Sequence, residues 1–274
     1  MKRVIQKFIR KTGKSYQRLA VLANGRLFCM LFNAHAAFKR IDVRFYCDNV
    51  NGVYKAKSGR FERFFYSKNQ NYNSYIMGMK ERGLALGRAY FCDKIAFQEG
   101  DWVIDCGANV GDLKLYFEVL NLKVNYLGIE PSPKEFECLQ RNVAPAKALN
   151  IGLWSHESSL DFYVSSQNAD SSFIEPQQYT DVVSVPTKRL DTIVNQPIKL
   201  LKIEAEGAEP EALVGCTDLL NNIEYISADL GFERGISQES TLTPVTNFLL
   251  TNGFELVSVS YPRIVALYKR CTLD

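Results

Sequence analysis

The stretch that decides the fold is Asp101-Trp-Val-Ile-Asp-Cys-Gly-Ala-Asn-Val-Gly-Asp112. Its apolar first half predicts a short buried strand, and the glycines at positions 107 and 111 predict a tight turn that leads directly into a helix. Gly107 lets the chain turn and leaves bare backbone for an approaching ligand. Gly111 lets the helix pack closely on the strand. Such a turn exposes backbone N–H groups at the helix N-terminus, so it is a candidate ligand site.

From this stretch to the C-terminus, predicted strands and helices alternate. The expected strands are 102–106, 125–130, 147–151, 199–204 and 224–229, and the expected helices are 111–121, 133–142, 209–220 and 240–252. Two final strands, 254–260 and 264–269, are joined by three residues, which permits only antiparallel pairing. The predicted fold is therefore α/β and Rossmann-like, with a mostly parallel seven-stranded sheet that ends in an antiparallel hairpin. This arrangement resembles class I methyltransferases more than dehydrogenases.

Residues 1–80 follow another pattern and are expected to form an N-terminal extension of helices and a hairpin, ahead of a domain at 81–274. The expected elements are a basic helix over 3–23, an apolar helix from Asn24-Gly25 to about Phe38, a strand over 41–46, an Asn51-Gly52 turn, a partner strand over 53–56, and a helix over 82–98. The aromatic-rich segment 61–80 is compatible with a helix or with a loop over the active site.

Charge is distributed unevenly along the chain. Residues 1–40 hold ten Lys and Arg and no acid, so the remainder carries −7 against an overall +3. This basic arm suggests an anionic partner such as a membrane surface, and a solvated helix face is an equal alternative. Seven dispersed cysteines and two histidines favour free thiols in the cytoplasm and disfavour a metal centre. We expect a cytoplasmic protein, with peripheral contact to the inner membrane face through the arm as an option.

The spacing of the two glycines is Gly-x-x-x-Gly, which differs from the Gly-x-Gly-x-x-Gly dinucleotide fingerprint. Acids surround the turn, so Asp105 and Asp112 are predicted to face the cationic ammonium or sulfonium end of a ligand. Glu130 follows Asp105 by 25 positions and ends the second strand, where an acid typically accepts the ribose hydroxyls. Together these features predict an adenosyl cofactor; a generic doubly wound domain with a helix-capping acid is the alternative.

Six stretches over about residues 100–230 resemble, in consistent order, the FkbM family of methyltransferases. They are Val103–Gly111, Ile129–Lys134, Leu149–Leu153, Ser171-Ser172, Thr187–Asp191 and Leu201–Glu209. The last is the most specific, although Glu204-Ala205-Glu206-Gly207 stands where the family usually has Asp-Val-Glu-Gly. The resemblance implies S-adenosylmethionine as cofactor and places residues 150–152 near its adenine. The residues expected to bind it are Asp105, Gly107, Ala108, Asn109, Gly111, Asp112, Glu130, Pro131, Ser132, Asn150, Ile151 and Gly152.

Three acids follow the fourth and fifth predicted strands: Glu204, Glu206 and Asp229. Ligands of open α/β sheets bind outside the carboxyl ends of the strands. An alcohol acceptor must lose a proton during methylation, so a carboxylate or histidine base is expected. We prefer Asp229 or Glu206 as the base, with Glu204 shaping the site; helix capping is the alternative for each acid. A metal held by Glu204 and Asp229 is disfavoured, because further oxygen ligands are not visible.

Other candidates have a packing or surface role as the stronger interpretation. His156 is expected in a solvated loop and His35 in a core or interface. Tyr66, Tyr72 and Tyr75 are compatible with an acceptor pocket or with ordinary packing. The segment Asn168–Phe173 is compatible with a loop beside the cofactor or with a plain surface turn.

These observations predict an S-adenosylmethionine-dependent O-methyltransferase that acts on a hydroxyl of a sugar or glycan precursor. The sugar follows from the family resemblance, and the basic arm suits a membrane-proximal acceptor. The alternatives are a polyketide or other small metabolite as acceptor, and a non-catalytic module that keeps the cofactor fold. A nucleic-acid acceptor is disfavoured by the acidic body and by the lack of an Asn-Pro-Pro-aromatic motif. The oligomeric state stays open.

Overall fold

The computed structural model describes residues 22–48, 52–66, 74–165 and 171–271. The chain divides into two compact units, Met1–Glu81 and Arg82–Asp274. Most of the helix predicted at 3–23 lies outside the described residues, as do Asn51 of the predicted turn, Tyr72, and the start of the Asn168–Phe173 segment. Within the described ranges, no helix combines the length and apolar character needed to cross a bilayer.

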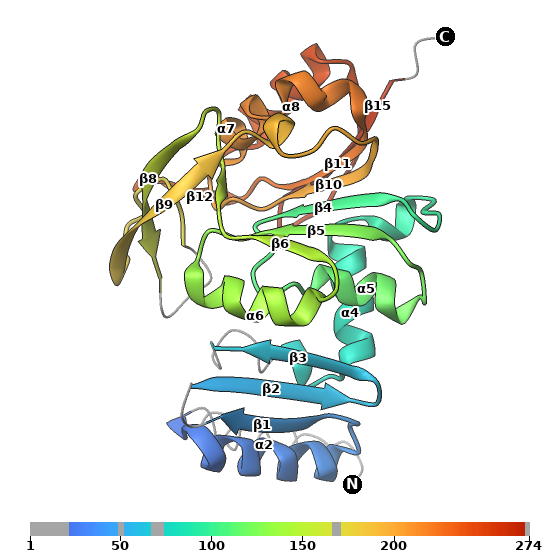
Figure 1. Ribbon diagram of the computed structural model, residues 1–274, viewed down its shortest axis with the longest axis vertical. Coiled ribbons are helices and arrows are strands. Elements are labelled where there is room, and N and C mark those ends of the chain that lie inside the picture. Colours follow the sequence, from blue (N-terminus) through green and yellow to red (C-terminus); the bar gives the residue numbers. More distant parts are fainter. Residues whose placement is uncertain (1–21, 49–51, 67–73, 166–170, 272–274) are drawn as a thin grey trace, which may run out of the picture. The chain divides into compact units, whose positions relative to one another are not determined.

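One seven-stranded sheet organises the larger unit, in the order β14-β15-β11-β10-β4-β5-β6 (Figure 1). Its strands are β4 (Trp102–Cys106), β5 (Asn125–Ile129), β6 (Lys147–Leu149), β10 (Ile198–Ile203), β11 (Ile223–Asp229), β14 (Phe254–Val259) and β15 (Val265–Arg270). β15 pairs antiparallel with β11 and β14, and the remaining neighbours pair in parallel. The predicted Rossmann-like sheet with an antiparallel C-terminal hairpin is confirmed. The link between β14 and β15, residues 260–264, is too short for a crossover.

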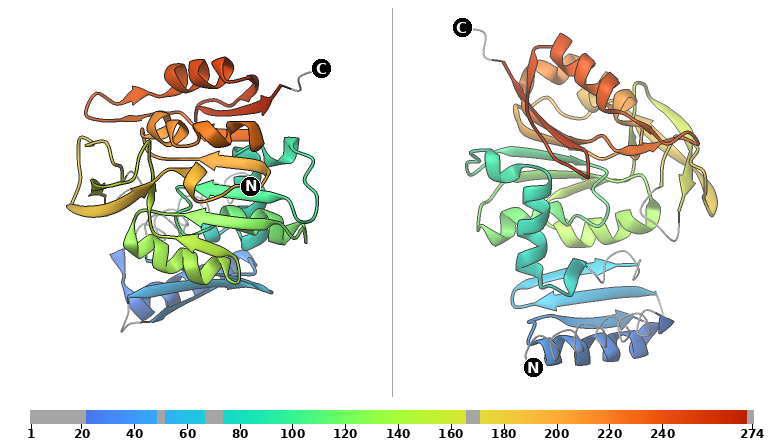
Figure 2. Two further views of the ribbon diagram at one scale, coloured as in Figure 1. Left: turned by 45° about the horizontal axis from the view of Figure 1, so that its top comes forward. Right: turned by 180° about the vertical axis from the view of Figure 1, so that it is seen from behind.

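Alternating side chains of the strands build two apolar layers, one on each face of the sheet. Ile104, Leu201 and Ile226 pack on one face with residues of α7 (Glu209–Val214), η3 (Thr217–Asn222) and α8 (Leu242–Thr251). Val103, Leu200 and Leu267 pack on the other face with residues of η1 (Cys92–Lys94), α5 (Leu113–Val119) and α6 (Pro133–Val143). Figure 2 shows these helices from two further directions. The predicted two-faced helix cover is therefore present.

Two small sheets of the larger unit were not predicted. One is β7-β9-β8, formed by β7 (Gly152–Leu153), β8 (Ser158–Val164) and β9 (Asp181–Lys188), and the other pairs β12 (Phe232–Arg234) with β13 (Glu239–Ser240). Most side chains of β8 and β9 are exposed or half-buried, so the apolar alternation that announces a strand is weak. The helix predicted at 209–220 is also interrupted, because α7 ends at Val214 before Gly215, where the backbone of Trp154 comes so close that a side chain would not fit.

The smaller unit contains α2 (Gly25–Lys39) and an antiparallel sheet of β1 (Arg44–Asp48), β2 (Val53–Ser58) and β3 (Phe61–Phe65). Its core is aromatic: α2 and the three strands contribute Phe28, Phe32, Phe45, Tyr54 and Phe65, and Tyr75 packs against Phe65. Residues 61–65 thus form a third strand, so the prediction of a helix or a loop was wrong for these residues. The glycine at 59, with φ +54°, permits the tight turn that pairs β2 with β3.

The helix predicted at 82–98 is shorter at its C-terminal end than expected. α4 (Met79–Ala89) spans the boundary between the two units, and the 3₁₀ helix η1 follows it. Phe91, between α4 and η1, adopts a left-handed conformation with φ +57°, so the α-helix does not continue through it. In the larger unit, Tyr90 is thereby buried at the end of α4.

The turn after β4 depends on glycine for two different contacts. Gly107 has φ +68°, and a Cβ there would lie 1.7 Å from the carbonyl oxygen of Glu204. Gly111 has φ +83°, and a Cβ there would lie 2.7 Å from Val143 and 2.8 Å from Leu139, both of α6. The absence of a side chain at Gly107 therefore lets the backbone of Glu204, just after β10, approach the turn. The absence of a side chain at Gly111 lets α6 pack against it. From the sequence, the bare backbone at Gly107 had been expected to leave room for a ligand.

Replacing Gly107 with alanine is expected to lower the free energy of unfolding by several kcal/mol, because the methyl group would overlap the backbone of Glu204. Gly100→Ala is the matched control: Gly100 also has positive φ, +87°, but nothing lies within 4 Å of its Cβ position. That control is expected to lose only the conformational cost of about 1–2 kcal/mol. Urea denaturation of both variants measures the difference; equal losses would contradict the close contact.

Candidate functional site

The candidate site lies at the carboxyl ends of β4, β5, β10 and β11. β4 has β5 on one side and β10 on the other, so consecutive strands leave β4 in opposite directions across the sheet. Such a switch point opens a crevice outside the strand ends, where ligands of open α/β sheets bind. The predicted cofactor residues and the predicted catalytic acids follow these four strands.

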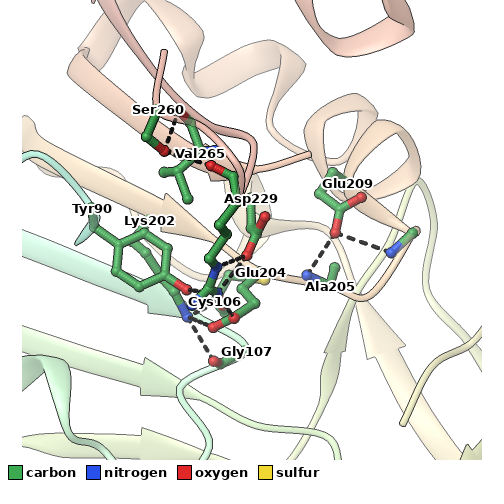
Figure 3. Close-up of polar contacts among 12 residues, drawn as sticks. Tyr90, Cys106, Gly107, Lys202, Glu204, Ala205, Glu209, Asp229, Ser260 and Val265 are labelled. Atoms are coloured by element: carbon green, nitrogen blue, oxygen red, sulfur yellow. Dashed lines mark hydrogen bonds and ion pairs between the residues drawn. The ribbon is translucent and has the colours of Figure 1, made fainter. Parts of the chain in front are cut away.

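Lys202 is the centre of the polar contacts at this edge. It lies in β10 directly opposite Asp105 of β4, and its side chain is 3% exposed. Its Nζ donates to the carbonyl oxygens of Gly107 at 2.7 Å and Cys106 at 3.2 Å. The same Nζ lies 3.0 Å from Asp105 Oδ1 and 3.0 Å from Glu204 Oε2 (Figure 3). The Lys202 ammonium group of β10 thus contacts β4, the turn that follows β4, and Glu204 just after β10.

The charged side chains around Lys202 shift one another's pKa values. Burial would neutralise the Lys202 amine, but the two adjacent carboxylates raise its pKa well above the usual range. Burial likewise disfavours the Glu204 carboxylate, yet Lys202 and Arg263 together lower its pKa to about 2. Burial raises the pKa of Asp105, and Lys202 and the hydroxyl of Tyr126 partly oppose that rise. The buried Lys202 ammonium and the half-buried Glu204 carboxylate therefore favour each other's charged forms.

Arg263 brings the C-terminal hairpin into the same network. It lies in the short link between β14 and β15, and its guanidinium donates to Asp229 Oδ2 through Nε and to Glu204 Oε1 through Nη2. Nη2 also donates to the hydroxyl of Tyr90 at 2.7 Å. The Tyr90 ring has the Arg263 guanidinium carbon 5.3 Å and Lys202 Nζ 5.1 Å from its centre. Figure 3 shows Tyr90, Lys202, Glu204 and Asp229 converging.

Glu130 ends β5 and is held by backbone on both sides. Its Oε2 accepts from the N–H of Asn109 at 2.7 Å, and its Oε1 accepts from the N–H of Ser132 at 2.9 Å. Burial raises the pKa of Glu130 to about 8, although both N–H bonds favour the ionised form. The amide of Asn150 donates to the carbonyl oxygens of Glu130 at 2.8 Å and Pro131 at 2.9 Å. Backbone N–H groups after β4 and β5 thus hold the carboxylate of Glu130, and Asn150 holds the backbone that follows β5.

The backbone N–H groups of the turn after β4 are all used within the protein. Gly107 and Ala108 donate to the carbonyl oxygen of Ile129, both at 3.0 Å, and Gly111 donates to Ala108. Asn109 donates to Glu130, and Val110 donates to the side chain of Asn109. Because a pyrophosphate site presents such N–H groups to its ligand, this arrangement is unsuited to an anion.

The structure separates the predicted cofactor residues into two groups. Gly107, Ala108, Asn109, Glu130, Pro131, Ser132 and Asn150 come together around the ends of β4, β5 and β6. Asp105 and Asp112, which were expected to face a cationic ligand, each have a cationic side chain beside them: Asp105 faces Lys202, and Asp112 accepts from Arg82 Nε at 2.8 Å. Ile151 and Gly152 are buried, and Gly152 packs tightly on the ring of Phe173.

The three predicted catalytic acids have different surroundings. Glu204 is paired with two cations. Asp229 is 1% exposed, and burial raises its pKa while Arg263 opposes the rise. Glu206 has φ +48°, its carbonyl oxygen accepts from Ser172 Oγ at 2.7 Å, and its side chain hydrogen-bonds with that of Glu233. Among the described residues, no group of three or more metal-binding side chains occurs.

The secondary candidates take packing or surface positions. His156 is exposed, and its Nδ1 lies 3.0 Å from the hydroxyl of Ser155. His35 is buried on α2, and burial lowers its pKa. Tyr75 is part of the aromatic core of the smaller unit. Ser172 links its loop to Glu206, as noted above, so the described end of the Asn168–Phe173 segment does border the site.

Four residues of the site were not singled out from the sequence: Tyr90, Lys202, Glu209 and Arg263. Lys202 carried a signal, because a lysine inside the apolar run of β10 needs a buried carboxylate. Glu209 accepts from the N–H groups of Ala205 at 2.9 Å and Gly207 at 3.1 Å and from Thr241 Oγ1 at 2.9 Å, which shapes the loop after β10. Tyr90 and Arg263 carried no local signal, because each meets its partners only in the folded chain.

Known proteins resemble this chain within its larger unit. The family described as Methyltransferase FkbM domain matches residues 105–256, more than half of the chain. Methyltransferase 1 of Beauveria bassiana is 27% identical over 164 residues, covering 48% of this chain and 66% of that protein. Methyltransferase sdnD of Sordaria araneosa is 26% identical over 154 residues, covering 42% of this chain and 60% of that protein. The chain thus spans less than two thirds of either relative. A solved FkbM methyltransferase from Methylobacillus flagellatus is 17% identical, covering 72% of this chain and 52% of that one, with a TM-score of 0.49.

Replacing Lys202 with methionine is expected to cost about 3–5 kcal/mol of stability, because it leaves the buried carboxylate of Asp105 without its cation and removes one of the two cations beside Glu204. Lys199→Met is the control on the same strand: Lys199 pairs with Glu224 at 2.7 Å, and that carboxylate is 45% exposed. Its loss is expected to cost about 1 kcal/mol or less. Urea unfolding of the two variants checks this, and similar midpoints would contradict the central role of Lys202.

Proposed function

The chain belongs to the FkbM methyltransferase family, and on that premise we propose that it transfers the methyl group of S-adenosylmethionine to an oxygen atom of an acceptor. One observation carries the proposal: Glu130 ends β5 immediately beside the glycine turn that follows β4, within the matched region. An acid at this position is suited to the ribose of a nucleoside cofactor.

The residues of the site fit the chemistry of that cofactor. Each oxygen of Glu130 accepts one backbone N–H and retains capacity for a second hydrogen bond, which suits the two ribose hydroxyls. The N–H groups of the turn are occupied, so phosphate is disfavoured. Asp229 Oδ1 is buried and accepts no hydrogen bond from the described residues. Carboxylates outnumber cations around it, which suits a ligand bearing a sulfonium and an ammonium.

When bound, S-adenosylmethionine supplies its methyl group to the acceptor oxygen, the sulfur keeps the electron pair of the broken carbon–sulfur bond, and the acceptor hydroxyl must release one proton. The protein's contribution is to hold the acceptor in line and to receive that proton. Asp229 and Glu206 are the candidate bases, as expected from the sequence. Glu204 is less suited, because Lys202 and Arg263 hold its pKa near 2.

We propose a hydroxyl of a sugar or glycan precursor as the acceptor. Support comes from the family resemblance and from the carboxylates at the strand ends, which a hydroxyl acceptor requires and an already anionic acceptor does not. A polyketide or other small metabolite is the second candidate, because the two fungal relatives are named only as methyltransferases. Location in the cytoplasm, with contact of the basic arm to an anionic membrane surface, belongs to the same proposal and rests on the sequence.

We expect the purified protein to bind S-adenosylhomocysteine, and Glu130→Gln to weaken that binding by about 10- to 100-fold. The reason is that hydrogen bonds to a charged group contribute about 1.5–3 kcal/mol and each 1.4 kcal/mol is tenfold in affinity. Isothermal titration calorimetry measures the dissociation constant of S-adenosylhomocysteine for the wild type and for Glu130→Gln. Glu224→Gln, at the exposed start of β11, is the control. Absence of binding, or an unchanged affinity in Glu130→Gln, would refute the cofactor assignment.

Turnover separates the enzyme from a binding module. Methyl-labelled S-adenosylmethionine is incubated with a panel of neutral sugars, glycan precursors and small phenolic or polyketide metabolites, and label transfer is counted. Transfer to a sugar hydroxyl supports the proposal. Cofactor binding without transfer to any class of acceptor favours the non-catalytic module.

A further inference from the structure

The two oxygens of the Asp229 carboxylate have different surroundings. Oδ2 accepts a hydrogen bond from Arg263 Nε. Oδ1 is buried and accepts no hydrogen bond from any residue that the structure describes, although the side chain is only 1% exposed. A buried carboxylate oxygen without a donor is costly. This cost suggests that a hydrogen-bond donor from outside the chain completes the site.

The open side of Oδ1 faces Gly231. A methyl group placed on Gly231 would lie 3.7 Å from Asp229 Oδ1 and 3.4 Å from Glu233 Oε1. Both carboxylates therefore border the same small space, just beyond the end of β11. Glu233 is half-buried there and hydrogen-bonds with Glu206, whose carbonyl oxygen is fixed by Ser172.

The charge around this space is negative. Within the described part of the chain, the carboxylates of Asp105, Glu204, Glu206 and Asp229 lie near two cations, Lys202 and Arg263. A fifth acid, Glu233, has its pKa raised to about 7 by burial and by the charge of Asp229, with the hydrogen bond to Glu206 opposing the rise. Arg234 does not balance them, because it is bound to Glu211 at 2.7 Å. An anionic group is repelled from such a site, and a hydrogen-bond donor is favoured.

Resting on the proposed function, we propose that the space beside Gly231 is the acceptor subsite. It holds a neutral hydroxyl of the acceptor, which donates a hydrogen bond to Asp229 Oδ1, and it excludes acceptors that carry a phosphate or carboxylate next to that hydroxyl. Asp229 then takes the proton that the hydroxyl releases. Glu206 is the second candidate base. Arg263 is a positioning residue, since by holding Oδ2 it turns Oδ1 toward the subsite.

Gly231→Ala is the sharpest variant for testing the subsite. Gly231 does not have a positive φ, and the added methyl would make contacts of ordinary van der Waals length, so the protein is expected to fold normally. The methyl nevertheless fills the space between the two carboxylates. Phe232→Ala is the matched control, because Phe232 is the next residue and its side chain is 65% exposed.

Glycerol and glycerate are suitable probes, because they differ by one charge on the same three-carbon skeleton. With S-adenosylhomocysteine present, each is titrated into ¹⁵N-labelled protein while the amide signals of Gly231 and Glu233 are followed. We expect saturable glycerol shifts in the wild type and in Phe232→Ala, at least tenfold weaker binding of glycerate, and at least tenfold weaker glycerol binding in Gly231→Ala and Asp229→Asn. S-adenosylhomocysteine affinity is expected to change less than twofold in Gly231→Ala.

Three results would overturn the subsite: no saturable glycerol shift, which would indicate that only water fills the space; glycerate binding as tightly as glycerol; or an unchanged glycerol response in Gly231→Ala. Failure of the proposed function is a separate observation, namely no affinity of the wild type for S-adenosylhomocysteine.

The role of Arg263 is tested by ¹³C NMR titration of the Asp229 carboxyl. Arg263→Gln is expected to raise the pKa of Asp229 and Arg263→Lys to restore it in part; equal pKa values in all three proteins would remove Arg263 from the proposal.

Discussion

The buried ammonium of Lys202 is the interaction on which the rest of this site depends. It bonds to two carbonyl oxygens of the turn after β4 and to carboxylates of β4 and β10, with almost no exposure to solvent. Two charges taken out of water repay their desolvation only when geometry and hydrogen bonding are good, and here one cation serves both carboxylates and both carbonyls. The consequence is a fixed alignment of the ends of β4 and β10, at the point where the sheet opens.

This alignment divides the acids of the site by function. Asp105, Asp112 and Glu204 each have a cation of the protein beside them, so their charge stabilises the fold. Asp229 also has a cation beside it, Arg263, but only at Oδ2; its buried Oδ1 accepts no hydrogen bond from the residues that the structure describes. Carboxylates that look equivalent in the sequence are therefore structural or chemically available according to which cation reaches them.

The cofactor side of the crevice is built by another means. Glu130 is oriented by backbone N–H groups from two loops, and Asn150 holds the loop that follows β5. These contacts are between neighbouring parallel strands, so the sheet itself supplies the geometry. The acceptor side, in contrast, needs Arg263 from the C-terminal hairpin and Glu233 from β12, elements that follow the parallel strands in the chain.

Local pattern determined much of this protein. Apolar alternation, the two glycines after β4 and the acid ending β5 act over a few residues, so the strand and helix order, the antiparallel tail and the group around Glu130 could be predicted. Patterns with weak alternation could not, which is why β3, β8 and β9 were missed. Only the tertiary structure decided which cation meets which acid, because Lys202 and Asp105, or Arg263 and Asp229, come together through pairing of distant strands and the closure of the tail hairpin. The physical reason is that a buried charge is defined by its partner in space, and the sequence positions of the partners carry no local trace of that contact.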